Sequence, residues 1–123
     1  KAHISLDVVT SKERFSPTLL ELEDLYNKVL KKGIEIRIIT EHQQIANEAQ
    51  EVIQTLTKRP GFKIRYIDKK PEAIVSIIDK KQAFISLSST AHLQNTSALL
   101  SNNECFAALV QSYFEEKWLK AHP

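Results

Sequence analysis

Short polar side chains and one histidine follow three of the strands that the sequence predicts. The candidate ligand-binding residues are Thr10, Thr40, Glu41, His42, Ser88 and Ser89. In open sheets with parallel strands, ligands bind in the crevice at the carboxyl ends of the strands. The pattern therefore predicts a pocket for a small molecule at that edge. Two simpler interpretations compete with it, because His42 could merely begin a helix and the serines could belong to a solvated loop.

No arrangement of residues in the sequence indicates catalysis, a metal ion or a cofactor. The four histidines are far apart, whereas a metal needs several ligands that converge on it. Cys105 has no identifiable base beside it, so we predict a semi-buried structural thiol. The G-x-S-x-G elbow is absent, and two glycines are too few for a glycine-rich phosphate loop. We expect no catalytic residue, no metal and no cofactor.

Charge and composition narrow the choice of partners. The chain has 17 basic and 15 acidic residues, scattered along it, so we expect no direct contact with nucleic acid. Lys69–Lys70 and Lys80–Lys81 could contact phosphate, although solvated turns have the same composition. No run approaches the ~18 apolar residues of a membrane span, so no membrane contact is expected. A single cysteine is typical of a reducing compartment, which predicts a cytoplasmic protein.

Hydrophobic periodicity defines the elements that must position these side chains. Alternating or continuous apolar runs predict strands at 4–9, 34–39, 62–67, 73–78, 83–88 and 97–100. Helical spacing predicts a first helix with Ser16 as N-cap and Pro17 at its first position, ending before Gly33. A second helix is predicted at 43–58. The S-x-x-E pattern at 101–104 predicts the start of a third.

The order of these elements predicts an α/β fold. Strand, helix, strand, helix and strand in succession indicate parallel pairing, and 73–78 with 83–88 reads as a hairpin. We therefore expect one domain over 1–123, with a mixed, largely parallel sheet flanked by helices. Because the chain starts at Lys1 without Met, we also expect it to be part of a longer protein.

From Gly33 onward the chain resembles one half of the phospholipase D fold. The segments 77–79 and 83–86 look like the hairpin of that family, 33–40 like its second strand, and 113–118 like its terminal helix. Closer still is the similarity to inactive phospholipase-D-like regulatory domains of archaeal signalling proteins. Their pattern includes KKGI-x-IRIIT, IRYID, an AIVSIIDKKQAFISL-like hairpin, and SNN before a YFEEKW-like helix, and this sequence carries each of them.

The departures from the family motif bear on activity. Active members carry H-x-K-x(4)-D; with Asp79 as its aspartate, Glu72 stands in place of the nucleophilic histidine and Ile74 in place of the lysine. Asn95 matches a polar position after the hairpin, but Ser97 stands where active enzymes have a glutamate. A glutamate would repel the phosphate and an isoleucine cannot donate to it. The resemblance therefore implies a scaffold without catalysis.

These observations predict a cytoplasmic sensory domain of a two-component histidine kinase. It would bind an unknown small molecule, form a homodimer, or both, and bias an output module in the same parent chain. Two alternatives stay open. The domain could serve ligand binding or assembly in a transcription regulator of the TrmB type, or it could be a phosphodiesterase that uses a different site.

Overall fold

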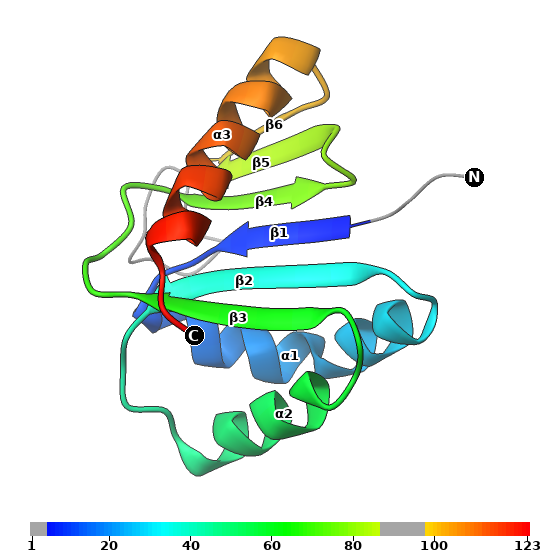
Figure 1. Cartoon of the computed structure of the whole chain (residues 1–123), viewed down its shortest axis with the longest axis vertical. Coiled ribbons are helices and arrows are strands. Elements are labelled where there is room, and N and C mark those ends of the chain that lie inside the picture. The colour runs from blue at the N-terminus through cyan, green and yellow to red at the C-terminus, as the bar shows by residue number, and fades with distance from the viewer. Residues whose placement is uncertain (1–4, 87–97) are drawn as a thin grey trace.

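The computed structural model describes residues 5–86 and 98–123, which form one six-stranded sheet with three helices (Figure 1). The strands are β1 (Ser5–Val9), β2 (Glu35–Glu41), β3 (Phe62–Ile67), β4 (Ile74–Ile78), β5 (Gln82–Ser86) and β6 (Ala98–Ser101). The helices are α1 (Lys12–Lys31), α2 (Asn47–Thr57) and α3 (Glu104–Lys120). The strand order is β3-β2-β1-β4-β5-β6.

The sheet is mixed, which confirms the α/β class. β1 pairs with β2 and β2 with β3 in parallel, whereas the pairs β1–β4, β4–β5 and β5–β6 are antiparallel. The parallel part is thus smaller than expected. A parallel pair needs a long crossover connection, usually a helix, and α1 and α2 supply this only for the first three strands.

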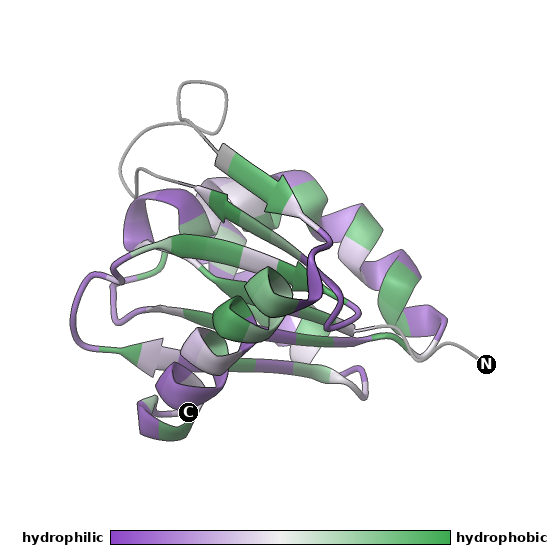
Figure 2. Ribbon diagram, turned by 90° about the horizontal axis from the view of Figure 1, so that it is seen from above, coloured by the Kyte–Doolittle hydropathy of each residue, from purple (hydrophilic) through white to green (hydrophobic). Residues whose placement is uncertain are grey.

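Each face of the sheet carries its own hydrophobic core. Side chains alternate between the two faces of a strand, so Ile36 and Ile38 of β2 face α1 and α2, while Ile39 faces α3. Figure 2 shows the sheet lying between α3 on one side and α1 and α2 on the other. The α3 core centres on Phe114 and Trp118, whose rings stack with centroids 5.8 Å apart. Both side chains are buried.

Helix α1 begins at Lys12, earlier than the predicted start at Pro17. The local sequence lacks the reason for this start, because the cap comes from another strand: Glu41 of β2 accepts a hydrogen bond from the Lys12 backbone N–H at 3.0 Å. Pro17 consequently lies inside the helix. The end was predicted correctly. Gly33 has φ +84°, and the N–H groups of Gly33 and Ile34 donate to the carbonyls of Leu30 and Val29, a Schellman motif.

Helices α2 and α3, unlike α1, start later than the sequence suggested. β2 runs on through Glu41, so α2 begins only at Asn47. β6 includes Ser101, and the N-cap of α3 is Asn103, whose Oδ1 accepts from the Phe106 N–H at 3.0 Å. Cys105 follows in the first turn and is exposed, not semi-buried as predicted. Among the residues described, no helix combines the length and the apolar character that crossing a membrane requires.

Candidate functional site

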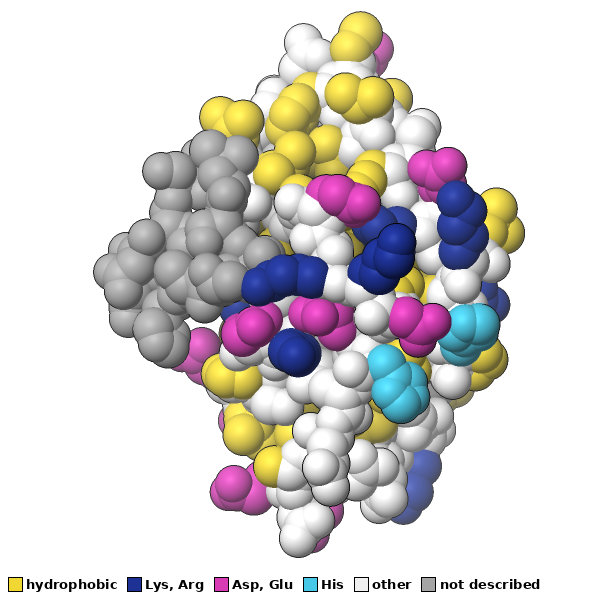
Figure 3. Space-filling view, turned by 90° about the vertical axis from the view of Figure 1, so that its left-hand side faces the viewer, with side chains coloured by type: hydrophobic (Ala, Val, Ile, Leu, Met, Phe, Trp, Pro, Cys, Tyr) yellow, Lys and Arg dark blue, Asp and Glu magenta, His cyan; other side chains and the backbone are white. Residues whose placement is uncertain are grey.

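The edge of the sheet to which the parallel strands point holds most of the predicted ligand-binding residues. Figure 3 looks onto this end of the molecule, where basic and acidic side chains are interleaved across the middle of the face. Thr10, Thr40, Glu41 and His42 all lie at the ends of β1 and β2, because these strands pair in parallel register. Ser88 and Ser89 lie outside the described residues. The role of this group in ligand binding stays a prediction.

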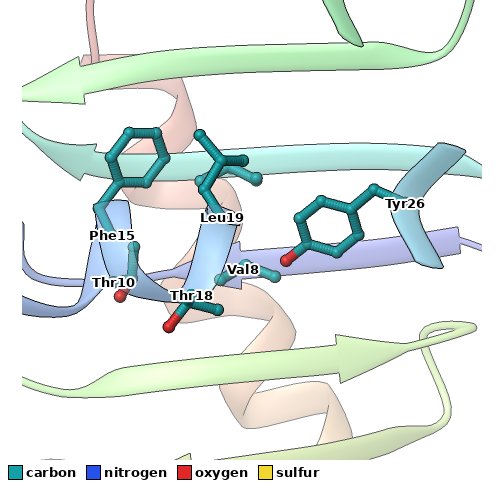
Figure 4. Close-up of a pocket in the computed structure, with 7 residues that line it drawn as sticks. Val8, Thr10, Phe15, Thr18, Leu19 and Tyr26 are labelled. Carbon is teal, nitrogen blue, oxygen red and sulfur yellow. The ribbon is translucent and has the colours of Figure 1, made fainter. Parts of the chain in front are cut away.

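Thr10 lines a cavity beneath α1 (Figure 4). The cavity has a volume of about 30 Å³, and its walls are mainly apolar side chains such as Phe15, Leu19 and Tyr26. That space admits a water molecule, whereas pockets for small-molecule ligands begin at roughly 300 Å³. The cavity is therefore a packing void between α1 and the sheet.

Glu41 and His42, at the end of β2, lie in different surroundings and have different contacts. The Glu41 carboxylate is buried and caps α1, where the positive end of the helix dipole favours a negative charge. His42 is exposed and meets the Tyr66 ring edge-on at a centroid distance of 5.9 Å. Its backbone N–H donates to the Ile67 carbonyl at 2.8 Å, which continues the pairing with β3. Glu41 thus stabilises the start of α1, whereas the His42 side chain is accessible to solvent.

Glu72, which stands at the position of the family's nucleophile, is held by two side chains of α3. Its Oε1 lies 2.8 Å from the Lys117 Nζ and accepts from the Tyr113 hydroxyl at 3.1 Å. The hydrogen bond from Lys117, together with the backbone and the charge of Lys117, lowers the pKa of Glu72 to about 2. Burial and the neighbouring carboxylate raise the pKa of Tyr113 to about 12. Glu72 is therefore an anion near neutral pH, fixed where an imidazole would have to act.

Of the other two motif positions, one holds an apolar side chain and the other an aspartate in a turn. Ile74 is buried at the start of β4, and Asp79 lies beyond the opposite end of that strand. Asp79 serves the turn into β5: its φ is +60°, and its backbone N–H donates to the Ser5 carbonyl at 2.7 Å. Aspartate tolerates this left-handed conformation better than most residues. Nor do three potential metal ligands gather anywhere in residues 5–86 and 98–123.

Next to Glu72 the structure has a larger pocket that the sequence did not single out. It has a volume of about 260 Å³ and lies between the turn after β3 and the end of α3. Its polar lining residues are Asp68, Lys69, Lys70, Glu72, Lys117, Lys120 and His122. Lys69–Lys70 was the one indication in the sequence. The other two lysines, Lys117 and Lys120, come from the end of α3, about fifty residues away along the chain, which only the fold brings to the same place.

A second charged group lies between the sheet and α3, and of its members Asp7 is buried. Arg37 makes two hydrogen bonds to Asp7, at 2.8 and 3.1 Å, and two to Glu115, at 2.7 and 3.1 Å. Gln111 donates to both carboxylates, and the Arg37 guanidinium lies over the Phe114 ring at 4.7 Å. Burial would lower the pKa of Arg37, but the hydrogen bonds to Glu115 and Asp7 outweigh it and raise the pKa. This network fastens α3 to β1 and β2.

No protein-family model matches the sequence, and no curated protein matches it either. Solved structures do. TrmBL2, described as an archaeal chromatin protein with a novel mode of DNA binding, aligns with a TM-score of 0.69 at 19% identity over 94% of this chain and 44% of that one. Nuc, a phospholipase D family member from Salmonella typhimurium, aligns with a TM-score of 0.69 at 13% identity over 99% of this chain and 82% of that one.

These similarities correct one prediction. The expectation of no direct contact with nucleic acid is wrong as an exclusion, because TrmBL2, which has this fold, is described as binding DNA. Scattered charge in the sequence was a poor criterion, since recognition depends on the local field on the folded surface and not on net charge. Neither similar protein is described as a histidine kinase. The chain spans 44% of the length of TrmBL2, and at these identities the similarity establishes the fold: one of the phospholipase D and TrmB-like type.

Proposed function

We propose that this chain is a non-catalytic regulatory domain of a DNA-associated protein, such as a transcription regulator or a chromatin protein. The observation that carries the proposal is the state of Glu72. In a fold shared with a phospholipase D family member, the position of the nucleophile holds a carboxylate engaged by Lys117 and Tyr113. The scaffold of a phosphodiesterase is kept, and its reactive centre is replaced by an ion pair.

The chemistry of phosphoryl transfer explains why this centre would be inactive. A nucleophile must approach the phosphorus atom, and cations must stabilise the negative charge that develops on its oxygens. Glu72 is an anion that repels a phosphodiester, and its cation, Lys117, already makes a 2.8 Å ion pair. Ile74 is apolar and buried. Neither residue can take the role that the motif assigns to its position.

The association with DNA is supported by the similarity to TrmBL2 and by the lysines at the end of the sheet. TrmBL2 is described as binding DNA, and 94% of this chain aligns with it. Four lysines line the pocket beside Glu72. Lysines that neutralise phosphates release counterions, so binding of this kind weakens steeply with salt.

Two measurements on the same preparation test the proposal. We expect no turnover of bis(p-nitrophenyl) phosphate by the chain, with or without added divalent cations. We also expect a fluorescein-labelled DNA duplex to gain anisotropy on titration, and its affinity to fall between about 50 and 200 mM salt. Turnover that Glu72→Gln abolishes would overturn the inactive assignment. An anisotropy that stays flat at low salt would overturn the association with DNA.

The sensory domain of a two-component kinase stays a prediction, as does a cytoplasmic location. Its small-molecule site would be the group of Thr10, Thr40, Glu41 and His42 with the two serines outside the described residues. A thermal-shift screen of metabolites tests it, because a ligand at 100 times its dissociation constant adds about 2.7 kcal/mol of stability. Of the four members that the structure describes, His42 is the one whose side chain a ligand could reach without disturbing the fold.

A further inference from the structure

The pocket beside Glu72 has walls that are fixed to each other by backbone pairing. The Tyr66 N–H of β3 donates to the His122 carbonyl at 2.6 Å, and the His122 N–H donates back to Tyr66 at 2.8 Å. Arg65 donates to the Trp118 carbonyl at 2.7 Å and lies over the Trp118 ring at 4.2 Å. The end of α3 is thus bound to β3. The pocket therefore lies between two segments that hydrogen bonds hold in place.

The lining of this pocket is predominantly basic. Lys69, Lys70, Lys117 and Lys120 contribute four positive charges, and Asp68 and Glu72 contribute two negative ones. The nearest further carboxylates are weak partners: Lys70 lies 3.7 Å from Glu13 and Lys120 lies 3.8 Å from Glu116, with all four side chains substantially exposed. Exposed pairs of this kind contribute little and are screened by salt. The excess of lysine charge therefore remains available to an anion.

Lys117 is the least exposed of the four cations. Its side chain is 20% exposed, its Nζ lies 5.1 Å from the centroid of the Tyr113 ring, and Glu72 holds it at 2.8 Å. Glu72 itself is 75% exposed and reaches into the pocket from the segment before β4. A carboxylate that is mostly in water can leave its partner at small cost. Its oxygens occupy the place on Lys117 that an incoming anion would need.

We infer that this pocket binds a phosphate group through Lys117, Lys120, Lys69 and Lys70, and that Glu72 competes with the phosphate for Lys117. The inference deepens the proposed function by naming the residues and the chemistry of the contact. The cations do not stand at the family's reactive positions, because they come from the turn after β3 and from α3; Glu72 alone stands at such a position. At about 260 Å³ the pocket takes a phosphate with its nearest atoms, supplied either by a nucleic-acid backbone or by a small phosphorylated molecule.

The competition has a physical basis that fixes the direction of each substitution. A phosphate approaching Lys117 meets the repulsion of Glu72 and must displace its hydrogen bond. Removing the charge of Glu72 therefore favours the phosphate twice, by freeing Lys117 and by removing a like charge. Removing the charge of Lys117 acts in the opposite direction. Each effect is up to about fivefold in affinity, the equivalent of one exposed ion pair.

The test measures the binding of inorganic pyrophosphate by calorimetry, and of labelled single-stranded and duplex DNA by anisotropy, to the wild-type chain and four variants. Glu72→Gln and Lys117→Gln change the pocket. Glu51→Gln on α2 and Lys28→Gln on α1 change the net charge by the same amount at exposed positions elsewhere. Circular dichroism of every variant establishes that the fold is kept. We expect tighter binding in Glu72→Gln and weaker binding in Lys117→Gln, each beyond its control.

The two probes separate the sources of the phosphate. If the variants change pyrophosphate binding, the pocket takes a free phosphorylated molecule; if they change only the DNA titrations, it takes the backbone of nucleic acid. The inference is overturned if neither probe distinguishes the pocket variants from their controls. The proposed function is judged separately, by whether the wild-type chain binds DNA at all. DNA binding that all variants share would support the proposed function through another surface while overturning the inference about this pocket.

Discussion

Two groups of this protein pair acidic with basic side chains, but in opposite surroundings. Between the sheet and α3, Asp7, Arg37 and Glu115 form a network in which the Asp7 side chain is 2% exposed. At the end of the sheet, Glu72 and Lys117 form a pair in which the carboxylate is 75% exposed. The shortest contact in each group is below 3 Å, so distance does not distinguish them.

The burial of the carboxylate does distinguish the two groups, because it decides whether water can replace the cation as its partner. A buried carboxylate that loses its cation has no water to replace it, whereas an exposed one is solvated at once. The network around Asp7 therefore stabilises the packing of α3 on the sheet. The Glu72 pair is an association that an external anion can replace. The following predictions test this contrast, beginning with the largest expected effect.

Arg37→Met should destabilise the protein by about 3 kcal/mol, because it leaves the buried Asp7 charge without its main partner. We expect the lower end of the range for broken buried pairs, since the Lys80 Nζ lies 3.8 Å from Asp7 Oδ2 and partly compensates. Urea denaturation measures the free energy of unfolding. Lys63→Met is the matched control, because Lys63 pairs in register with Arg37 on β3 but is exposed. A loss no larger than that of the control would refute the fastening role.

Glu41→Ala should cost about 1–2 kcal/mol, an effect between those of the two ion-pair groups. The Glu41 carboxylate is buried but its partner is the first N–H of α1 and not a charged side chain. The free energy of unfolding from urea titration measures this cost, with Glu48→Ala at an exposed position of α2 as control. Equal values for the two variants would show that α1 does not depend on this cap.

Glu72→Gln should change the free energy of unfolding by less than about 0.5 kcal/mol at neutral pH. The small effect follows from solvent screening of the exposed pair. Glu51→Gln provides the comparison in the same denaturation series. A loss approaching that of Arg37→Met would mean that Glu72 is a structural residue, and the contrast between the two groups would fail.

The pKa of Glu72 gives the finest test. In the folded state it is about 2, below its ordinary value of 4.5, so the contribution of the pair to stability is complete above pH 4.5. That contribution is lost as the pH falls from 4.5 toward 2. A carboxyl-detected NMR titration should give a value below 4.5 for the wild-type chain and a value nearer 4.5 for Lys117→Gln, and solvent screening of the exposed pair keeps the difference small. Titration of Glu72 near 4.5 in the wild type would show that the ion pair is not formed in solution.

Local patterns in the sequence predicted those parts of the fold that neighbouring residues control. The strand at 62–67 matches β3 at both ends, and Gly33 ends α1 as expected. The start of α1 was missed because its cap is Glu41, on another strand. The site was missed for a similar reason. Lys69–Lys70 drew attention as a basic turn, but no pattern in the sequence connects Lys117 and Lys120 with it, because only the packing of α3 places them beside that turn.

The sequence by itself determined the alternation of strands and helices and the absence of the reactive histidine and lysine, because periodicity and residue identity are local properties. Only the tertiary structure decided which charges are buried and which remain in water. Asp7 and Glu72 are both ordinary acidic residues in the sequence, and no pattern separates them. The packing of α3 buries Asp7 and leaves Glu72 exposed beside a basic pocket. Because desolvating an unpaired charge is costly, the buried Asp7 must keep its cation and so stabilises the fold, whereas the exposed Glu72 can exchange its cation with a ligand.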